Sequence, residues 1–134
     1  MLGRYYLPSP ERCQPVMGVT LDFESNFNVA PGEQAPILIQ SSPDEIELVQ
    51  AHWGLIPHWS EDRSFALKMI NARAETVSQK PAYKEAFRHR RCLVIAGGFY
   101  TWVGETEHKQ PYVIGLQKDL PMIMAGVWEV WQQE

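Results

Sequence analysis

The sequence lacks long apolar runs and is poor in cysteine and histidine. Two of its 134 residues are Cys and four are His, too few for a disulfide framework, and no His pair has the i, i+4 spacing of a helical metal site. No run reaches the roughly 18 apolar residues of a membrane-spanning helix. The first residues, MLGRYYLPSPERC, have no apolar signal-peptide core. We therefore predict no metal, no cofactor, no membrane partner and a cytoplasmic location.

Positive charge is concentrated in the middle of the chain. The formal net charge is −4, but the segment from Arg63 to Arg91 holds eight of the twelve bases and only two of the sixteen acids. A basic segment in an acidic chain is typical of an anion-binding face. The alternative is a solvated helix face, and charge alone does not separate the two.

Strand patterns dominate the sequence, and turn residues are spread throughout. We predict strands at 35–40, 47–56, 91–97, 98–103, 111–116 and 122–131, and one clear helix at 78–90 with Ser78 as its cap and Pro81 in its first turn. These elements indicate a single α+β domain over 1–134, with a twisted or barrel-like antiparallel sheet and one or two short helices. Trp59 and Trp102 are predicted to pack in the core.

The stretch INARAE, at residues 70–75, alternates polar and apolar side chains. If it is extended, Asn71, Arg73 and Glu75 share one face. One interpretation is that this face holds a polar ligand. The alternative is a structural cluster that ties strands together without a ligand.

The segment at 122–131 is an apolar, aromatic strand pattern with no turn and partner strand after it. A hydrophobic strand left at a sheet edge tends to pair with another chain. We expect either that another element covers it or that the domain is shortened at its C-terminus, and we predict that the strand can form a homo-oligomer by pairing with another copy.

Six motifs occur in order along the chain: MxGRY, FNVAPGEQAPIL, WGLIPHWS, INARAETV, KPAYKEAFRHRRCLVIAGGFYTW and KQPYVI. Together they resemble the SOS-response-associated peptidase (SRAP) family of abasic-site processing proteins, from residue 1 to about residue 131. The resemblance implies binding of single-stranded DNA and reaction with abasic sites. In the family the amine of an N-terminal Cys forms an imine with the sugar aldehyde, and its thiol closes a thiazolidine. It also implies an intracellular, nucleoid-associated protein.

The family's functional residues are carried over only where the motifs match. Asn71 matches the Asn that holds the cysteine and the sugar. Arg4 and Arg73 match arginines that contact DNA phosphate, Trp53, Gly54 and Leu55 match a wall on which bases stack, and Pro31 lies in the matching turn near the pocket. To these matches we add Glu75, as a carboxylate that orients its neighbours, and Arg88, Arg90 and Arg91, as an extension of the phosphate contacts. The expected DNA-binding residues are therefore Arg4, Pro31, Trp53, Gly54, Leu55, Asn71, Arg73, Glu75, Arg88, Arg90 and Arg91.

Three departures from the family pattern concern its chemistry. Leu2 occupies the position of the family Cys, Thr101 occupies that of the family Glu, and no HxRMP segment with the family His is present. A large second residue also favours retention of Met1. Cys13 lacks an α-amine beside its thiol and is not expected to substitute.

Three functions therefore remain open. The first, which we favour, is a degenerate SRAP domain that binds single-stranded or abasic DNA without stable crosslinking. The second is an active crosslinking enzyme in a native form that has the Cys and the HxRMP segment. The third is a remnant or dimerising module without a DNA role.

Overall fold

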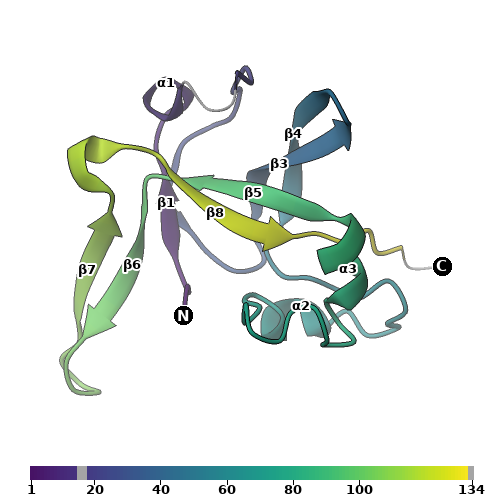
Figure 1. Ribbon diagram of the computed structural model, residues 1–134. Coiled ribbons are helices and arrows are strands. Elements are labelled where there is room, and N and C mark those ends of the chain that lie inside the picture. Colours follow the sequence, from purple (N-terminus) through teal and green to yellow (C-terminus); the bar gives the residue numbers. More distant parts are fainter. Residues whose placement is uncertain (15–17, 133–134) are drawn as a thin grey trace.

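The computed structural model describes residues 1–14 and 18–132, and it consists mainly of short strands (Figure 1). No helix in these ranges is long and apolar enough to cross a membrane. The elements are β1 (Tyr5–Leu7), α1 (Pro10–Cys13), β2 (Asn26–Val29), β3 (Gln34–Ser42), β4 (Glu45–His52), α2 (Phe65–Lys68), α3 (Lys84–His89), β5 (Arg91–Ala96), β6 (Gly98–Val103), β7 (Gln110–Gly115), a 3-10 turn η1 (Gln117–Asp119) and β8 (Met122–Val127).

The strands form two antiparallel sheets, ordered β2-β1-β6-β7 and β4-β3-β5-β8. Gly97 alone separates β5 from β6, so the chain turns from one sheet into the other at this point. A Cβ at Gly97 would overlap the ring of Tyr6, so the corner requires glycine. The predicted strand-dominated α+β architecture with antiparallel sheets is confirmed.

The main core lies between the two sheets and is built from aliphatic and aromatic side chains. Tyr5, Leu7, Val29, Leu38 and Ile95 are all buried. Burial of each such aliphatic side chain stabilises the fold by about 1.5–3 kcal/mol. This core fixes β1, and with it the N-terminal residues that precede β1.

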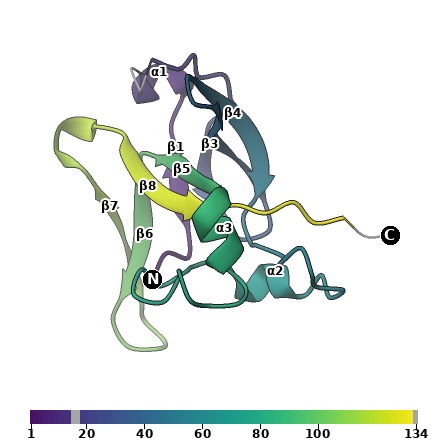
Figure 2. The ribbon, with the colours of Figure 1, turned by 45° about the vertical axis from the view of Figure 1, so that its right-hand side comes forward.

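A second, smaller cluster lies beneath α3 and outside the two sheets. Its buried members are Leu55, Val77, Tyr83 and Ala86. They come from the segment after β4, from the turns before α3 and from α3 itself. Figure 2 shows α2 and α3 on this side of the molecule, with the N-terminus between them and the β6–β7 hairpin, as in Figure 1.

The predicted helix at 78–90 is shorter in the structure. It begins at Lys84, with Tyr83 at the N-cap, and Ser78 lies in the preceding turns instead of capping it. The backbone N–H of Lys80 donates to the Thr76 carbonyl, but Pro81 has no N–H and disfavours helical backbone at Lys80. The turns before α3 are therefore interrupted at Lys80, and regular helix begins only at Lys84.

Two predicted strands also end early. The 47–56 prediction stops at His52, because Gly54 has φ +128° and bends the chain. The 122–131 prediction stops at Val127, after which Trp128 N–H donates to the Arg90 carbonyl and Trp131 Nε1 donates to the Ser60 carbonyl. The core positions predicted for Trp59 and Trp102 are wrong, since these side chains are 54% and 46% exposed.

Candidate functional site

The N-terminal segment meets the INARAE segment through one short hydrogen bond. Asn71 Nδ2 donates to the Leu2 backbone carbonyl at 2.6 Å, and the Asn71 side chain is partly buried. Sixty-nine positions separate the two residues in sequence. The contact brings the matched family Asn beside position 2, where the family has its cysteine.

INARAE is not a strand, so the prediction of one polar face is wrong. Residues 70–73 are irregular, and turns begin at Ala74, where the Arg73 carbonyl accepts bonds from Thr76 N–H at 3.1 Å and Val77 N–H at 2.9 Å. Ala72 and Ala74 are exposed, so no apolar face opposes the polar one. Arg73 and Glu75 lie at the surface, while Asn71 points toward the N-terminal segment.

Trp53 positions the backbone just before Asn71. Its indole Nε1 donates to the Ile70 carbonyl at 2.9 Å, and its ring lies 5.4 Å from the Tyr5 ring, centroid to centroid. Its backbone joins the Pro31 turn, with Gly32 N–H bonding to the Trp53 carbonyl at 2.8 Å and Trp53 N–H bonding to the Glu33 carbonyl at 3.0 Å. These two bonds tie Trp53 to the turn that follows the half-buried Pro31, and we refer to Trp53 and Pro31 together as the Trp53–Pro31 wall.

Gly54 and Leu55 hold the chain close to α2 rather than facing solvent. A Cβ at Gly54 would overlap the Ala66 carbonyl oxygen, and φ of +128° also favours glycine there. Leu55 is buried in the second cluster, and its N–H bonds to the Met69 carbonyl at 3.0 Å. Both residues therefore hold the backbone next to Trp53 against α2 and the residue that follows it.

Tyr83 is a site residue that the sequence pattern did not identify. Its hydroxyl donates to the Asn71 backbone carbonyl at 3.1 Å, and burial raises the pKa of the phenol. In the sequence Tyr83 looked like one more residue of a helix near an apolar stripe. Only the hydroxyl, on a ring otherwise suited to burial, could have indicated a polar partner.

Arg4 lies just before β1 and is half-buried. Its Nη1 donates to Asn28 Oδ1 at 3.1 Å, and its carbonyl accepts a bond from Tyr100 N–H at 3.0 Å. Tyr5 pairs with Phe99 across β1 and β6. Continuing that register beyond the paired residues sets Thr101 opposite Gly3.

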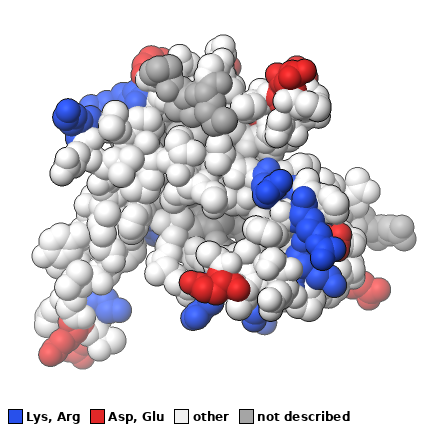
Figure 3. Space-filling model, viewed as in Figure 1, with Lys and Arg blue, Asp and Glu red and all other residues white. Residues whose placement is uncertain are grey.

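The three arginines near α3 that are predicted to contact phosphate differ in their surroundings. Lys and Arg side chains gather on the side that carries α3 (Figure 3), where Arg88 and Arg91 are exposed. Arg90 instead donates from Nη2 to Glu129 Oε2 at 2.9 Å, and its Nε is buried with no hydrogen-bond partner among the residues that the structure describes. His58 Nδ1 lies 3.2 Å from the same carboxylate oxygen. Arg90 is thus held inside the protein, unlike its two neighbours.

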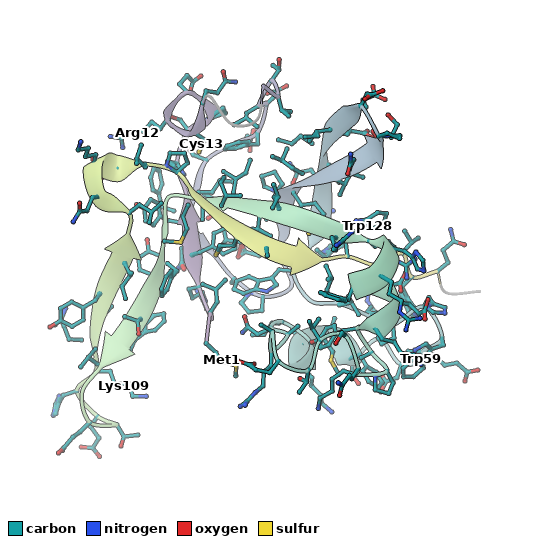
Figure 4. The ribbon with its side chains drawn as sticks, in the orientation of Figure 1. Met1, Arg12, Cys13, Trp59, Lys109 and Trp128 are labelled. Carbon is teal, nitrogen blue, oxygen red and sulfur yellow. The ribbon has the colours of Figure 1, made fainter. Side chains whose placement is uncertain are left out.

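Cys13 lies far from the N-terminal residue. Figure 4 shows Cys13 at the upper end of the molecule and Met1 on the lower side, beside the N-terminus of β1. Cys13 is fully buried, and burial raises the pKa of its thiol. The structure therefore offers no thiol from Cys13 near Asn71, in agreement with the expectation from sequence.

Known proteins resemble this chain over most of its length. It is 35% identical to the abasic site processing protein YoaM of Bacillus subtilis over 111 residues, which are 82% of this chain and 48% of that protein. It is 35% identical to the abasic site processing protein HMCES of Xenopus tropicalis over 138 residues, 82% of this chain and 41% of that protein. A crystal structure of a Bordetella bronchiseptica protein shares the fold, with a TM-score of 0.82, 21% identity, and coverage of 97% of this chain and 64% of that chain.

The chain spans about half the length of the curated relatives that it matches. The family model described as SOS response associated peptidase (SRAP) matches residues 1–134, the whole chain. The sequence motifs and the antiparallel sheets agree with that match. The chain therefore belongs to the SRAP family.

Proposed function

We propose that this chain binds single-stranded DNA and recognises abasic sites at the junction of Asn71 with the N-terminal segment, without forming a stable covalent crosslink. The observation that carries this proposal is the hydrogen bond from Asn71 to the Leu2 carbonyl. The names of the relatives, abasic site processing proteins, support the same ligand. Expected contacts are Arg4 and Arg73 to phosphate, and the Trp53–Pro31 wall to a base.

Electrostatics supports a DNA strand that runs from this junction toward α3. Arg73, Arg88 and Arg91 are exposed, and the segment around them carries most of the positive charge of the chain. Each phosphate contact releases counterions and contributes affinity without reading sequence. In this proposal Glu75 orients the exposed Arg73. Arg90 stabilises the fold and does not contact the DNA.

Loss of stable crosslinking follows from the chemistry of the residues at positions 2 and 101. An amine and an aldehyde condense to an imine and release water. The family thiol would then add to the imine carbon and close a ring. Leu2 has no group that can add, and Thr101 supplies no carboxylate for proton transfer. Any imine formed by the amine of this chain would be open to hydrolysis.

Binding to labelled oligonucleotides over a salt series tests the proposal. We would compare an intact strand, a strand with one abasic site and a strand with an abasic analogue that lacks the aldehyde. We expect salt-dependent binding that favours both abasic strands and is weakened by Asn71→Ala. Equal affinity for all three strands would contradict the proposed recognition of abasic sites and leave only binding of single-stranded DNA. A band that survives denaturation without a reductant would overturn the loss of crosslinking.

We also propose, independently of DNA binding, that two copies pair through β8. This strand pairs with β5 on one side and forms the edge of its sheet, and Ile123 on it is exposed. A free strand edge with apolar side chains favours pairing with another chain. The solution mass tests this: we expect a dimer that Ile123→Lys converts to monomer. A wild-type monomer at high protein concentration would contradict it.

A further inference from the structure

Three consecutive backbone carbonyls lead up to the Asn71 side chain, and each accepts a hydrogen bond from a different donor. Leu55 N–H bonds to the Met69 carbonyl at 3.0 Å, and Trp53 Nε1 bonds to the Ile70 carbonyl at 2.9 Å. Tyr83 Oη–H bonds to the Asn71 carbonyl at 3.1 Å. The irregular segment 69–71 is therefore held by tertiary contacts, without the ladder of a strand.

Of these three donors, Tyr83 is the one that binds Asn71 itself. Its hydroxyl bonds to the Asn71 backbone carbonyl, and the Asn71 side-chain Nδ2 lies 2.6 Å from the Leu2 carbonyl oxygen. The ring is buried with Leu55, Val77 and Ala86, so the direction of the hydroxyl is set by packing at the start of α3. A buried hydroxyl requires a partner, and the Asn71 carbonyl supplies it.

We infer that Tyr83 is a positioning residue for the site: its hydroxyl holds the backbone of Asn71 so that the side-chain amide reaches position 2. A short, directional bond weakens steeply when its donor moves or tilts. Release of the Asn71 carbonyl lets the peptide rotate, and the amide then loses its alignment with the Leu2 carbonyl. For its effect on DNA this inference rests on the proposed function; for its effect on Asn71 it does not.

The chain contains three asparagines, Asn26, Asn28 and Asn71. Labelling with ¹⁵N-asparagine therefore gives a spectrum with three side-chain amide pairs, and Asn71→Ala identifies the one from Asn71. In the wild type we expect the Asn71 amide to exchange slowly and to show the small temperature coefficient of a bonded proton. In Tyr83→Phe, which keeps the ring and removes only the hydroxyl, we expect faster exchange and a larger coefficient.

Tyr100→Phe is the matched control. It also removes one bond from a Tyr hydroxyl to a backbone carbonyl, that of Phe27 at 2.6 Å, but it does not touch segment 69–71. We expect Tyr100→Phe to leave the Asn71 amide unchanged. An Asn71 amide that is the same in Tyr83→Phe as in the wild type, or that changes equally in both variants, would overturn the inference.

Two further measurements keep the outcomes distinct. If Tyr83→Phe does not fold, the wild type alone still tests the inference: an Asn71 amide that exchanges fast and has a large temperature coefficient there overturns it, because no aligned bond to the Leu2 carbonyl would then exist. On DNA, we expect Tyr83→Phe to reduce the preference for the abasic strand by about two- to tenfold, the effect of one hydrogen bond, with affinity for the intact strand unchanged. A wild type without any abasic preference would contradict the proposed function, whereas the NMR result would still decide the role of Tyr83.

Discussion

Asn71 Nδ2 and the Leu2 carbonyl oxygen lie 2.6 Å apart, and this bond joins two parts of the fold that are anchored separately. Residue 2 is fixed by β1, which pairs with both β2 and β6. On the other side, Tyr83 bonds to the carbonyl of Asn71 and Trp53 bonds to the carbonyl of the preceding residue, Ile70. Residue 2 is thus held at a defined position although it lies outside β1.

Leu2→Cys should convert this chain from a reversible binder to a crosslinking protein. A small second residue permits removal of Met1, so the amine and the thiol would then both be at the position beside Asn71. We expect a DNA adduct that survives denaturation on abasic strands only. Adding Thr101→Glu should raise the rate by about 100-fold or more, the typical effect of a positioned acid or base. Gel analysis with peptide mapping checks both results.

Leu2→Ser is the matched control for that prediction. It also permits removal of Met1 and places an amine at the same position, but it has no thiol to close a ring. We expect adducts from Leu2→Ser only when a borohydride reductant traps the imine. If Leu2→Cys gave no adduct while its N-terminal Cys was confirmed by mass, then the geometry around Asn71 would not support the family reaction.

Local patterns predicted four strands closely, missed the short strands β1 and β2, and predicted the connections poorly. The runs at 35–40, 91–97, 98–103 and 111–116 agree with β3, β5, β6 and β7 to within two residues at each end. In these runs the side chains are of the types that pack in a half-buried sheet, and turn residues mark the ends of the strands. INARAE has the same period of two, but its alanines contribute little burial and no strand pairs with it.

The site itself depended on contacts that no local pattern contains. The motif match could identify Asn71, but the Tyr83–Asn71 and Arg90–Glu129 bonds join residues 12 and 39 positions apart. Arg88, Arg90 and Arg91 look equivalent in sequence. Tertiary packing turns Arg90 inward and leaves the other two exposed, so only the structure separates a stability role from a binding role.

That distinction predicts different salt dependences for neighbouring arginines. For single-stranded DNA the slope of log affinity against log salt is about −0.7 per phosphate contact. We expect Arg91→Ala and Arg73→Ala each to make the slope shallower by about 0.7. Arg90→Ala should leave the slope unchanged and lower the stability of the fold. Titrations at several salt concentrations, with each variant checked for folding, measure both effects; a shallower slope for Arg90→Ala would instead place its guanidinium on the DNA.

Glu129→Gln should destabilise the fold through Arg90. The Glu129 side chain is only 7% exposed and accepts one hydrogen bond from Arg90, and His58 lies beside the same oxygen. Removing the charge leaves the partly buried guanidinium without its counter-ion, which costs about 1–3 kcal/mol. Urea denaturation measures the loss. Glu85→Gln is the control, because its exposed pair with His89 at 3.8 Å should contribute less than about 0.5 kcal/mol.

The two thiols should be inert in the folded protein, so that a crosslink formed by any variant can be assigned to position 2. Burial raises the pKa of the Cys92 thiol to about 11 and also raises that of Cys13. Because the thiolate is the reactive form, we expect iodoacetamide at pH 8 to modify neither residue in the native state and both in denaturant. Mass spectrometry checks the number of modifications.

The raised pKa of the Cys92 thiol also makes the free energy of unfolding fall at alkaline pH. A thiol protonated in the folded state and ionised in the unfolded one favours unfolding as pH rises, since the unfolded state then binds fewer protons. For Cys92 the stabilisation is fully present below pH 9 and is lost as pH rises toward 11, by up to about 2–3 kcal/mol. Cys92→Ala should flatten this decline in urea denaturation between pH 8.5 and 11, and an equally steep decline in that variant would assign it to other groups.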